Sequence, residues 1–193
     1  QAGCPWRASG AADANCGALY DDFETFRGWR ANAQGTDTAD DGTWQRGNPE
    51  PTALHGPKQL GTAVSASRVL VTGKASGRSA GANDVDGGRT TVTSGPVELP
   101  AAIGRLTFRY YLAHTSGSSK ADALRAVVMA DDGDHVVFTE TGAANDDNAA
   151  WSQASVDIDA FAGQTIRLRF EAVDAGGGNI VEAAIDDVRV RRP

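Results

Sequence analysis

Hydrophobic and polar residues alternate along several short stretches of this chain. In residues 166–172 the apolar side chains Ile166, Leu168 and Phe170 are separated by charged ones. A period of two residues is typical of a strand with one buried side and one side facing solvent. The same pattern, less regular, predicts further strands at residues 19–24, 68–72, 90–99, 106–112, 124–128, 135–139, 151–158 and 180–190.

Turn-forming residues separate these predicted strands. Asp131-Asp132-Gly133-Asp134 predicts a hairpin, because an Asp-Gly pair tolerates the positive φ angles of a tight turn. Glycines 176–178 predict another turn, and the chain holds 23 glycines in all. No stretch shows a helical pattern. About nine strands joined by turns therefore predict an all-β fold, a jelly-roll β-sandwich of two antiparallel sheets.

One long segment, residues 30–61, is rich in Asp, Thr, Gly, Asn and Pro. It is too long for an ordinary connection between strands. We therefore expect a folded loop, anchored by Trp29, Trp44 and Leu60.

The N-terminal region is expected to form a separate appendage, residues 1–19, ahead of one sandwich domain, residues 20–193. Cys4 and Cys16 are the only cysteines and flank a loop-like sequence, which predicts a local disulfide and an oxidising compartment. The sequence begins at Gln1 without an initiator Met or a signal sequence, as a processed protein or a trimmed chain would. We therefore expect a secreted, extracellular protein.

Composition narrows the classes of partner. Hydrophobic residues make up 40% of the chain, enough for one packed core, and the net charge is -7. A surface that binds nucleic acid needs clustered Lys and Arg, whereas the 18 basic residues here are scattered among 25 acidic ones. No stretch approaches the roughly 20 apolar residues of a membrane span. Neither nucleic acid nor a membrane is expected as a partner.

Carboxylates give the strongest signal for a binding site. Asp84 and Asp86 lie one residue apart, directly ahead of two glycines. In a loop, two such side chains can converge on one ion, and calcium prefers six to eight oxygen ligands. The alternative is an ordinary turn in which each Asp bonds to the backbone.

Two further acidic clusters mark the first and last predicted strands. Glu24 ends the cluster of residues 21–24, and Asp186 lies among the apolar residues of the last strand. A buried and unpaired carboxylate there would cost several kcal/mol, so it must face solvent or a cation. The first and last strands of a sandwich often lie side by side. Glu24 and Asp186 would then share an ion with the Asp84 loop; solvent-facing charge at a sheet edge is the alternative.

Several motifs carry a resemblance to known families. Asp22-Phe23-Glu24, Gly28-Trp29, Asp41-Gly42-Thr43-Trp44 and Ala184-Ile185-Asp186-Asp187-Val188 resemble MAM domains and related jelly-roll modules. Residues 21–190 are also similar to C-terminal accessory modules of secreted bacterial metallopeptidases, notably zinc carboxypeptidases. That similarity rests on motifs in the same order, among them Trp44-Gln45-Arg46-Gly47-Asn48-Pro49, Leu70-Val71-Thr72-Gly73, Phe161-Ala162-Gly163-Gln164-Thr165 and residues 79–88.

The resemblance implies a jelly roll beside a catalytic domain, stabilised by a structural calcium ion, Ca2+. The ligands it implies are Glu24, Asp84, Asp86 and Asp186, with Asp22, Asp37 and Asp187 as further candidates. The segment that holds the two cysteines lies outside the similarity.

Catalytic signals are poor, because the three histidines, His55, His114 and His135, are far apart and match no zinc-ligand spacing. No serine nucleophile motif is present, so no catalytic residue is predicted. We therefore expect a non-catalytic, calcium-binding accessory module of a secreted bacterial hydrolase. Its partner would be the catalytic domain of a parent enzyme, or an extracellular protein or polysaccharide.

Two alternatives stay open. A carbohydrate-binding module would need exposed aromatic rings to stack on sugars, and Trp6, Trp44 and Tyr111 are the candidates. Trp29, Trp151 and Tyr110 are expected in the core instead. A stand-alone hydrolase would need a site assembled from distant residues.

Overall fold

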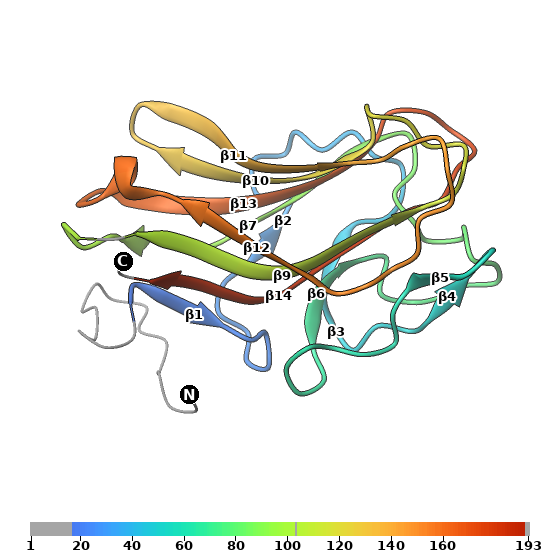
Figure 1. Ribbon diagram of the computed structural model, residues 1–193, viewed down its shortest axis with the longest axis horizontal. Helices are drawn as coiled ribbons and strands as arrows, with labels where there is room; N and C mark the ends of the chain where they lie inside the picture. Colours follow the sequence, from blue (N-terminus) through green and yellow to red (C-terminus); the bar gives the residue numbers. More distant parts are fainter. Residues whose placement is uncertain (1–16, 103, 192–193) are drawn as a thin grey trace.

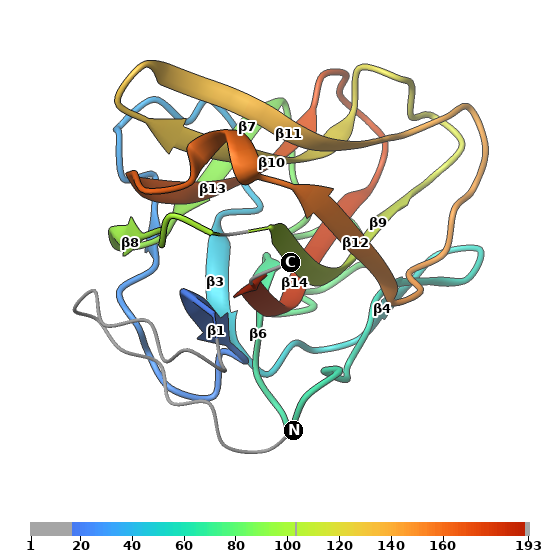
Figure 2. The same cartoon turned by 60° about the vertical axis from the view of Figure 1, so that its left-hand side comes forward.

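The computed structural model describes residues 17–102 and 104–191. Within these residues the strands form two antiparallel sheets of six strands each, and the sheets pack face to face (Figure 1; Figure 2 shows them from the side). The predicted jelly-roll sandwich is therefore confirmed. No helix in the described part of the chain has the length and apolar character needed to cross a membrane.

The sheet that contains the last strand is called the β14 sheet. Its strands, in spatial order, are β12 (Ser152–Asp157), β9 (Arg105–His114), β14 (Val181–Arg191), β6 (Val69–Thr72) and β3 (Trp44–Gly47), with β1 (Leu19–Asp21) also beside β14.

The opposite sheet is called the β13 sheet. Its strands, in spatial order, are β11 (Gly133–Thr141), β10 (Ala123–Ala130), β13 (Thr165–Asp174), β7 (Gly88–Thr93) and β2 (Arg30–Ala31), with β8 (Val97–Glu98) also beside β13. Outside both sheets lie the hairpin β4 (Thr52–Ala53) and β5 (Pro57–Gln59) and one 3-10 turn, η1 (Asp159–Phe161).

The core lies between the two sheets and follows the predicted alternation. On β13, Ile166, Leu168 and Phe170 are buried against the β14 sheet. The Phe170 ring stacks on Trp29 at 5.7 Å between centroids and meets the edge of Phe108 at 5.1 Å. Burial of such large apolar surfaces is the main stabilising term of the sandwich.

The first and last strands lie side by side, as expected. β1 pairs with β14 in antiparallel register, with Leu19 opposite Val190 and Asp21 opposite Val188. The Asp131–Asp134 hairpin is also confirmed, because Ala130 pairs with Gly133 where β10 turns into β11.

The long segment at residues 30–61 contains four short strands that its sequence did not predict, β2 to β5. β2 and β3 pair with β7 and β6, further along the chain, whereas β4 and β5 pair with each other. Each of the four has only two to four residues, too few for an alternation to mark it. The expected anchors are confirmed: Trp29 and Trp44 are buried in the core, and Leu60 packs on a second apolar cluster.

That second cluster covers the outer face of the β14 sheet. Tyr111, Val69 and Val71 are buried there, beneath the segment that carries the β4–β5 hairpin. The hairpin donates hydrogen bonds to its surroundings, for example from Lys58 Nζ to the Asp147 carbonyl oxygen at 2.9 Å. Part of this face is therefore closed to a partner.

Candidate binding face

The outer face of the β13 sheet is built from the polar half of the alternation on its strands. On β13, Arg167, Arg169 and Glu171 point away from the core residues described above. The register places Arg125 of β10 opposite Glu171, and Thr93 of β7 opposite Arg169. The sequence therefore folds into rows of charged and polar side chains that run across the sheet.

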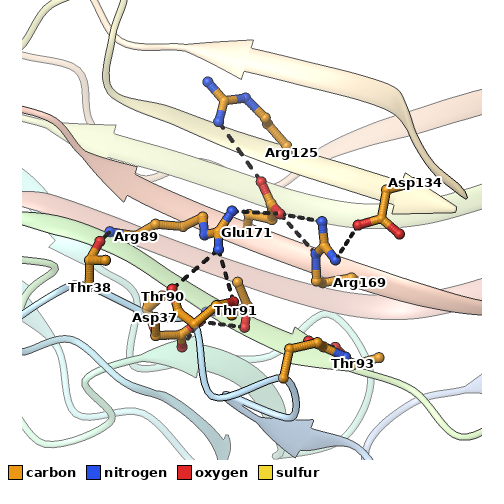
Figure 3. Close-up of polar contacts among 12 residues, drawn as sticks. Asp37, Thr38, Arg89, Thr90, Thr91, Thr93, Arg125, Asp134, Arg169 and Glu171 are labelled. Carbon is orange, nitrogen blue, oxygen red and sulfur yellow. Dashed lines mark hydrogen bonds and ion pairs between the residues drawn. The ribbon is translucent and has the colours of Figure 1, made fainter. Parts of the chain in front are cut away.

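Glu171 is the centre of this face, and its side chain is only 5% exposed. Its Oε1 lies 2.8 Å from Nη2 of Arg169 and accepts a hydrogen bond of 2.8 Å from Nε of the same guanidinium. Arg89 and Arg125 approach the carboxylate at 3.8 Å each (Figure 3). One nearly buried carboxylate therefore lies at the centre of three arginines and offsets part of their charge.

Arg169 is held from two sides. Its Nη1 also donates to Oδ2 of Asp134 at 2.7 Å. Burial lowers the pKa of Arg169, but its bonds to Asp134 and the charge of Glu171 outweigh burial, so that the pKa is raised. The guanidinium is thus fixed in place and charged.

The loop after β2 covers one edge of the face. Asp37 accepts hydrogen bonds from the Thr91 backbone N–H at 2.8 Å and from the Thr91 hydroxyl at 2.6 Å. Arg89 donates its backbone N–H to the Thr38 hydroxyl (Figure 3). Asp37, predicted as a calcium ligand, is engaged here in holding the loop to β7.

A pocket of about 460 Å³ opens at this end of the sheet. It is lined by residues of β2, β7 and β13 and by the segments after β2 and β7, including Arg30, Gln34, Thr93, Ser94 and Arg167. No acidic residue is among its lining residues. The protein as a whole is acidic, so this pocket is a local exception.

A second pocket, of about 160 Å³, lies on the opposite sheet, outside β9, β12 and β14. Arg109, Arg189 and Arg191 line it together with Asp187. It is smaller, and Arg189 is already engaged, because it pairs with Asp187 at 3.5 Å and lies over the Tyr20 ring at 4.4 Å.

The sequence of this chain matches the model of a known domain family. The model described as MAM domain, meprin/A5/mu, matches residues 22–193. The chain belongs to the MAM domain family. This confirms the resemblance seen in the motifs at both ends of the sandwich. No protein of curated function matches the sequence.

Solved structures share the sandwich of this MAM domain. The K1 cleaved adhesin domain of Lys-gingipain from Porphyromonas gingivalis W83 matches with a TM-score of 0.55 and 18% identity, over 91% of this chain and 98% of its own. The CBM22-1 xylan-binding domain of Xyn10C from Paenibacillus barcinonensis matches with a TM-score of 0.51 and 18% identity, over 94% and 97%. At these identities the likeness shows the fold alone.

The predicted calcium ligands of the MAM domain do not come together as expected. Asp84 accepts a hydrogen bond from the backbone N–H of Val181, at the start of β14. Asp186 lies five residues further along the same strand, which corresponds to roughly 16 Å. The shared site of Glu24, Asp84 and Asp186 is therefore not formed. Among the residues that the structure describes, no three acidic, His or Cys side chains are placed to hold one ion.

Glu24 and Asp186 instead bind the segment that leads into β6. Oε1 of Glu24 accepts hydrogen bonds from the backbone N–H groups of Ser67 and Arg68, at 2.8 and 2.6 Å. Oδ2 of Asp186 accepts from those of Val64 and Ser65, at 2.9 and 3.0 Å. Both carboxylates therefore anchor one loop to the first and last strands.

Asp22 and Asp187 have similar roles. Asp22 accepts a hydrogen bond from the Glu24 backbone N–H at 3.2 Å, a local turn. Asp187 has a positive φ of 50° at a register shift in β14 and accepts from the Ser65 hydroxyl at 2.9 Å. Because of this irregularity, the adjacent side chains of Asp186 and Asp187 both bond to the segment that leads into β6.

Asp84 lies in a buried acidic environment that the sequence only partly revealed. Burial, assisted by the charges of Asp86 and Asp174, raises its pKa to about 7. Burial and Asp84 also raise the pKa of Glu182 well above its ordinary value. Asp174 and Glu182 were missed because they lie within strands, without a turn motif beside them.

We expect the MAM domain to become less stable as pH rises from 5.5 to 8. A folded-state pKa near 7 means that Asp84 stabilises the fold when protonated, and that this contribution is lost as pH rises through about 7. The loss over this interval is about 2 kcal/mol. Thermal unfolding in a chelating buffer measures it, and Asp84→Asn should flatten the dependence. A midpoint that rises with pH would contradict the burial of this charge.

The predicted stacking aromatics are corrected by the structure. Trp44 is 3% exposed, because it packs in the core and donates its indole N–H to the Thr90 carbonyl oxygen. Tyr111 is 2% exposed, because the second apolar cluster covers its face of β9. Trp6 lies outside the described residues, as do Cys4 and Cys16 of the predicted disulfide.

Proposed function

We propose that this chain is a non-catalytic binding module that recognises an extracellular polymer on the outer face of the β13 sheet. The main support for this proposal is the pocket of about 460 Å³. It lies on the same sheet as the ion-paired cluster of Arg89, Arg125, Arg169 and Glu171. A volume of this size lies within the range of pockets that bind small molecules, about 300–1,000 Å³. The adhesin and xylan-binding domains of the same fold support a binding role.

The placement of the perturbed acids disfavours a hydrolase. A catalytic carboxylate needs a shifted pKa and access to a substrate. Asp84, Glu182 and Asp186 have raised pKa values, yet each is at most 1% exposed. None of them lines either of the two pockets.

Polysaccharide is the polymer class that we favour, and its recognition here is by hydrogen bonds and charge. Phe26 is the only exposed large aromatic side chain in the described part of the chain, and it does not line the pocket. Flat stacking of neutral sugars on tryptophan is therefore not the mechanism on this face. Arginine, glutamine and threonine side chains supply hydrogen-bond donors and acceptors instead.

The binding proposal is tested by affinity electrophoresis in gels that contain xylan or polygalacturonate. We expect the chain to be retarded by at least one of the two, relative to a gel without polysaccharide and to a non-binding protein of similar size. Incubation with the retarding polysaccharide should release no reducing sugar. Unchanged mobility in both gels would contradict carbohydrate recognition, and sugar release would contradict a purely binding role.

The wider context is part of the same proposal. We place the module in a secreted bacterial hydrolase, beside its catalytic domain, on the strength of the motif similarity to peptidase accessory modules. In that setting a binding module keeps the parent enzyme close to an extracellular polymer.

A structural calcium ion stays a proposal that rests on the motif resemblance alone, because the described side chains form no group of three ligands around one ion. An ion that binds only the folded state raises the unfolding midpoint by mass action. Thermal unfolding with 5 mM calcium, with magnesium and with chelator is the measurement, because 5 mM is about 5- to 50-fold above the dissociation constants of extracellular calcium modules, about 10⁻³ to 10⁻⁴ M. A midpoint several degrees higher in calcium alone is the predicted result. Equal midpoints in all three solutions would remove calcium from the account.

A further inference from the structure

We propose that the pocket at the end of the β13 sheet binds the carboxylate of an acidic sugar, so that the ligand is a polysaccharide containing uronic acid. This rests on the proposed binding function and names its ligand class. It follows from how the arginines of this face are distributed between partners.

Five arginines lie on the outer face of the β13 sheet, and they fall into two groups. Arg89, Arg125 and Arg169 surround Glu171 at 2.8–3.8 Å, and Arg169 also pairs with Asp134, so each of the three has an acidic partner within the protein. Arg30 and Arg167 form no ion pair with any residue that the structure describes. These two are the ones that line the pocket.

The position of Arg167 is fixed by the backbone beside it. Its Nη1 donates to the Ser94 carbonyl oxygen at 3.0 Å, which orients the guanidinium along the pocket wall. A guanidinium has five N–H donors, so four remain for a ligand. Arg30 reaches the same pocket from β2, because the register places it opposite Thr93 of β7.

The remaining polar groups suit a sugar. Thr93 is buried, and its hydroxyl donates to Oε1 of Gln34 at 3.3 Å. This bond holds the Gln34 amide at the pocket, with its Nε2 group left to donate to a ligand hydroxyl. A guanidinium group recognises a carboxylate through two parallel, planar hydrogen bonds. Together these groups match a ring that carries both hydroxyls and a carboxylate.

Alternative anions make different demands. A sulfated polymer can also accept forked hydrogen bonds from arginine, so its binding is compared directly with that of trigalacturonate. Loss of trigalacturonate binding in the Lys variant shows that the forked geometry of arginine is needed, and not its charge alone. A neutral sugar would use Gln34 and Thr93 and would be indifferent to both arginines.

Isothermal titration calorimetry with trigalacturonate, xylotriose and dextran sulfate tests the inference. We expect trigalacturonate to bind the wild-type chain, with about tenfold weaker affinity in Arg30→Ala and in Arg167→Ala, and at least about a hundredfold loss in the double variant. Arg30→Lys should behave like Arg30→Ala. Arg105→Ala, which removes the same charge from an exposed position on the β14 sheet, is the matched control and should bind as the wild type does.

The outcomes separate the inference from the function beneath it. Xylotriose binding without any preference for trigalacturonate would overturn the carboxylate site and leave the binding module intact. Trigalacturonate binding that survives in the double variant, or dextran sulfate binding that is at least as tight as trigalacturonate binding, would also overturn it. A chain that binds none of the three ligands would contradict both proposals. Both arginines are exposed, so the unfolding midpoints of the variants should stay near that of the wild type.

Discussion

Replacing Phe170 with alanine should lower the free energy of unfolding by about 4 kcal/mol. Phe170 is fully buried at the centre of the sandwich, between Trp29 of the first connection and Phe108 of the opposite sheet. Truncation would leave a cavity that these large rings cannot fill without leaving their rotamers. Urea unfolding followed by tryptophan fluorescence measures the loss.

A matched control is available in Phe26, which is 63% exposed. Phe26→Ala should change the stability by less than about 0.5 kcal/mol. If Phe170→Ala does not fold, Phe170→Leu should still show a loss of about 1–2 kcal/mol. A loss at Phe170 no larger than that at Phe26 would contradict the described core.

Replacing Glu171 with alanine should lower the free energy of unfolding by about 3 kcal/mol. The pair with Arg169 is the decisive part, because the side chains are 12% and 5% exposed and lie 2.8 Å apart. Arg89 and Arg125 are about one third exposed, so solvent screens their share and we assign them little. For a chain of this size the loss corresponds to a midpoint lower by about 6–12 °C.

Two variants isolate the cause. Glu171→Gln keeps the shape and the acceptor but removes the charge, and it should still destabilise, since three arginines remain without their common partner. Glu98→Ala removes an exposed carboxylate from β8 and should be nearly neutral. Equal stability of Glu171→Ala and Glu98→Ala would show that the ion pairs of Glu171 do not contribute to the stability of the fold.

Much of the fold follows from local patterns in the sequence. The alternation on β13 and β9 fixes which side chains face the core, because a strand has a strict period of two. Pairs such as β2 with β7 are different. Only two residues of each strand are paired, and the pairing forms because the long connection folds back onto the sheet. The local sequence pattern therefore does not predict this pairing.

The candidate site was harder to predict than the fold. The clustered acidic residues indicate an ion site, yet Glu24 and Asp186 accept hydrogen bonds from backbone N–H groups of residues 64–68. The arginines were visible on the polar side of β13. Which of them form an ion pair with Glu171 depends on the register between strands, and only the folded chain defines that register.

The most direct test of the account asks where a ligand binds. A ¹H–¹⁵N correlation spectrum of the labelled chain, titrated with trigalacturonate and separately with xylotriose, locates the contact residue by residue. We expect the shifts to concentrate at Arg30, Thr93 and Arg167, around the pocket of the β13 sheet. Shifts that concentrate instead at Thr107 and Arg189, in the pocket of the β14 sheet, or no shifts with either sugar, would contradict it.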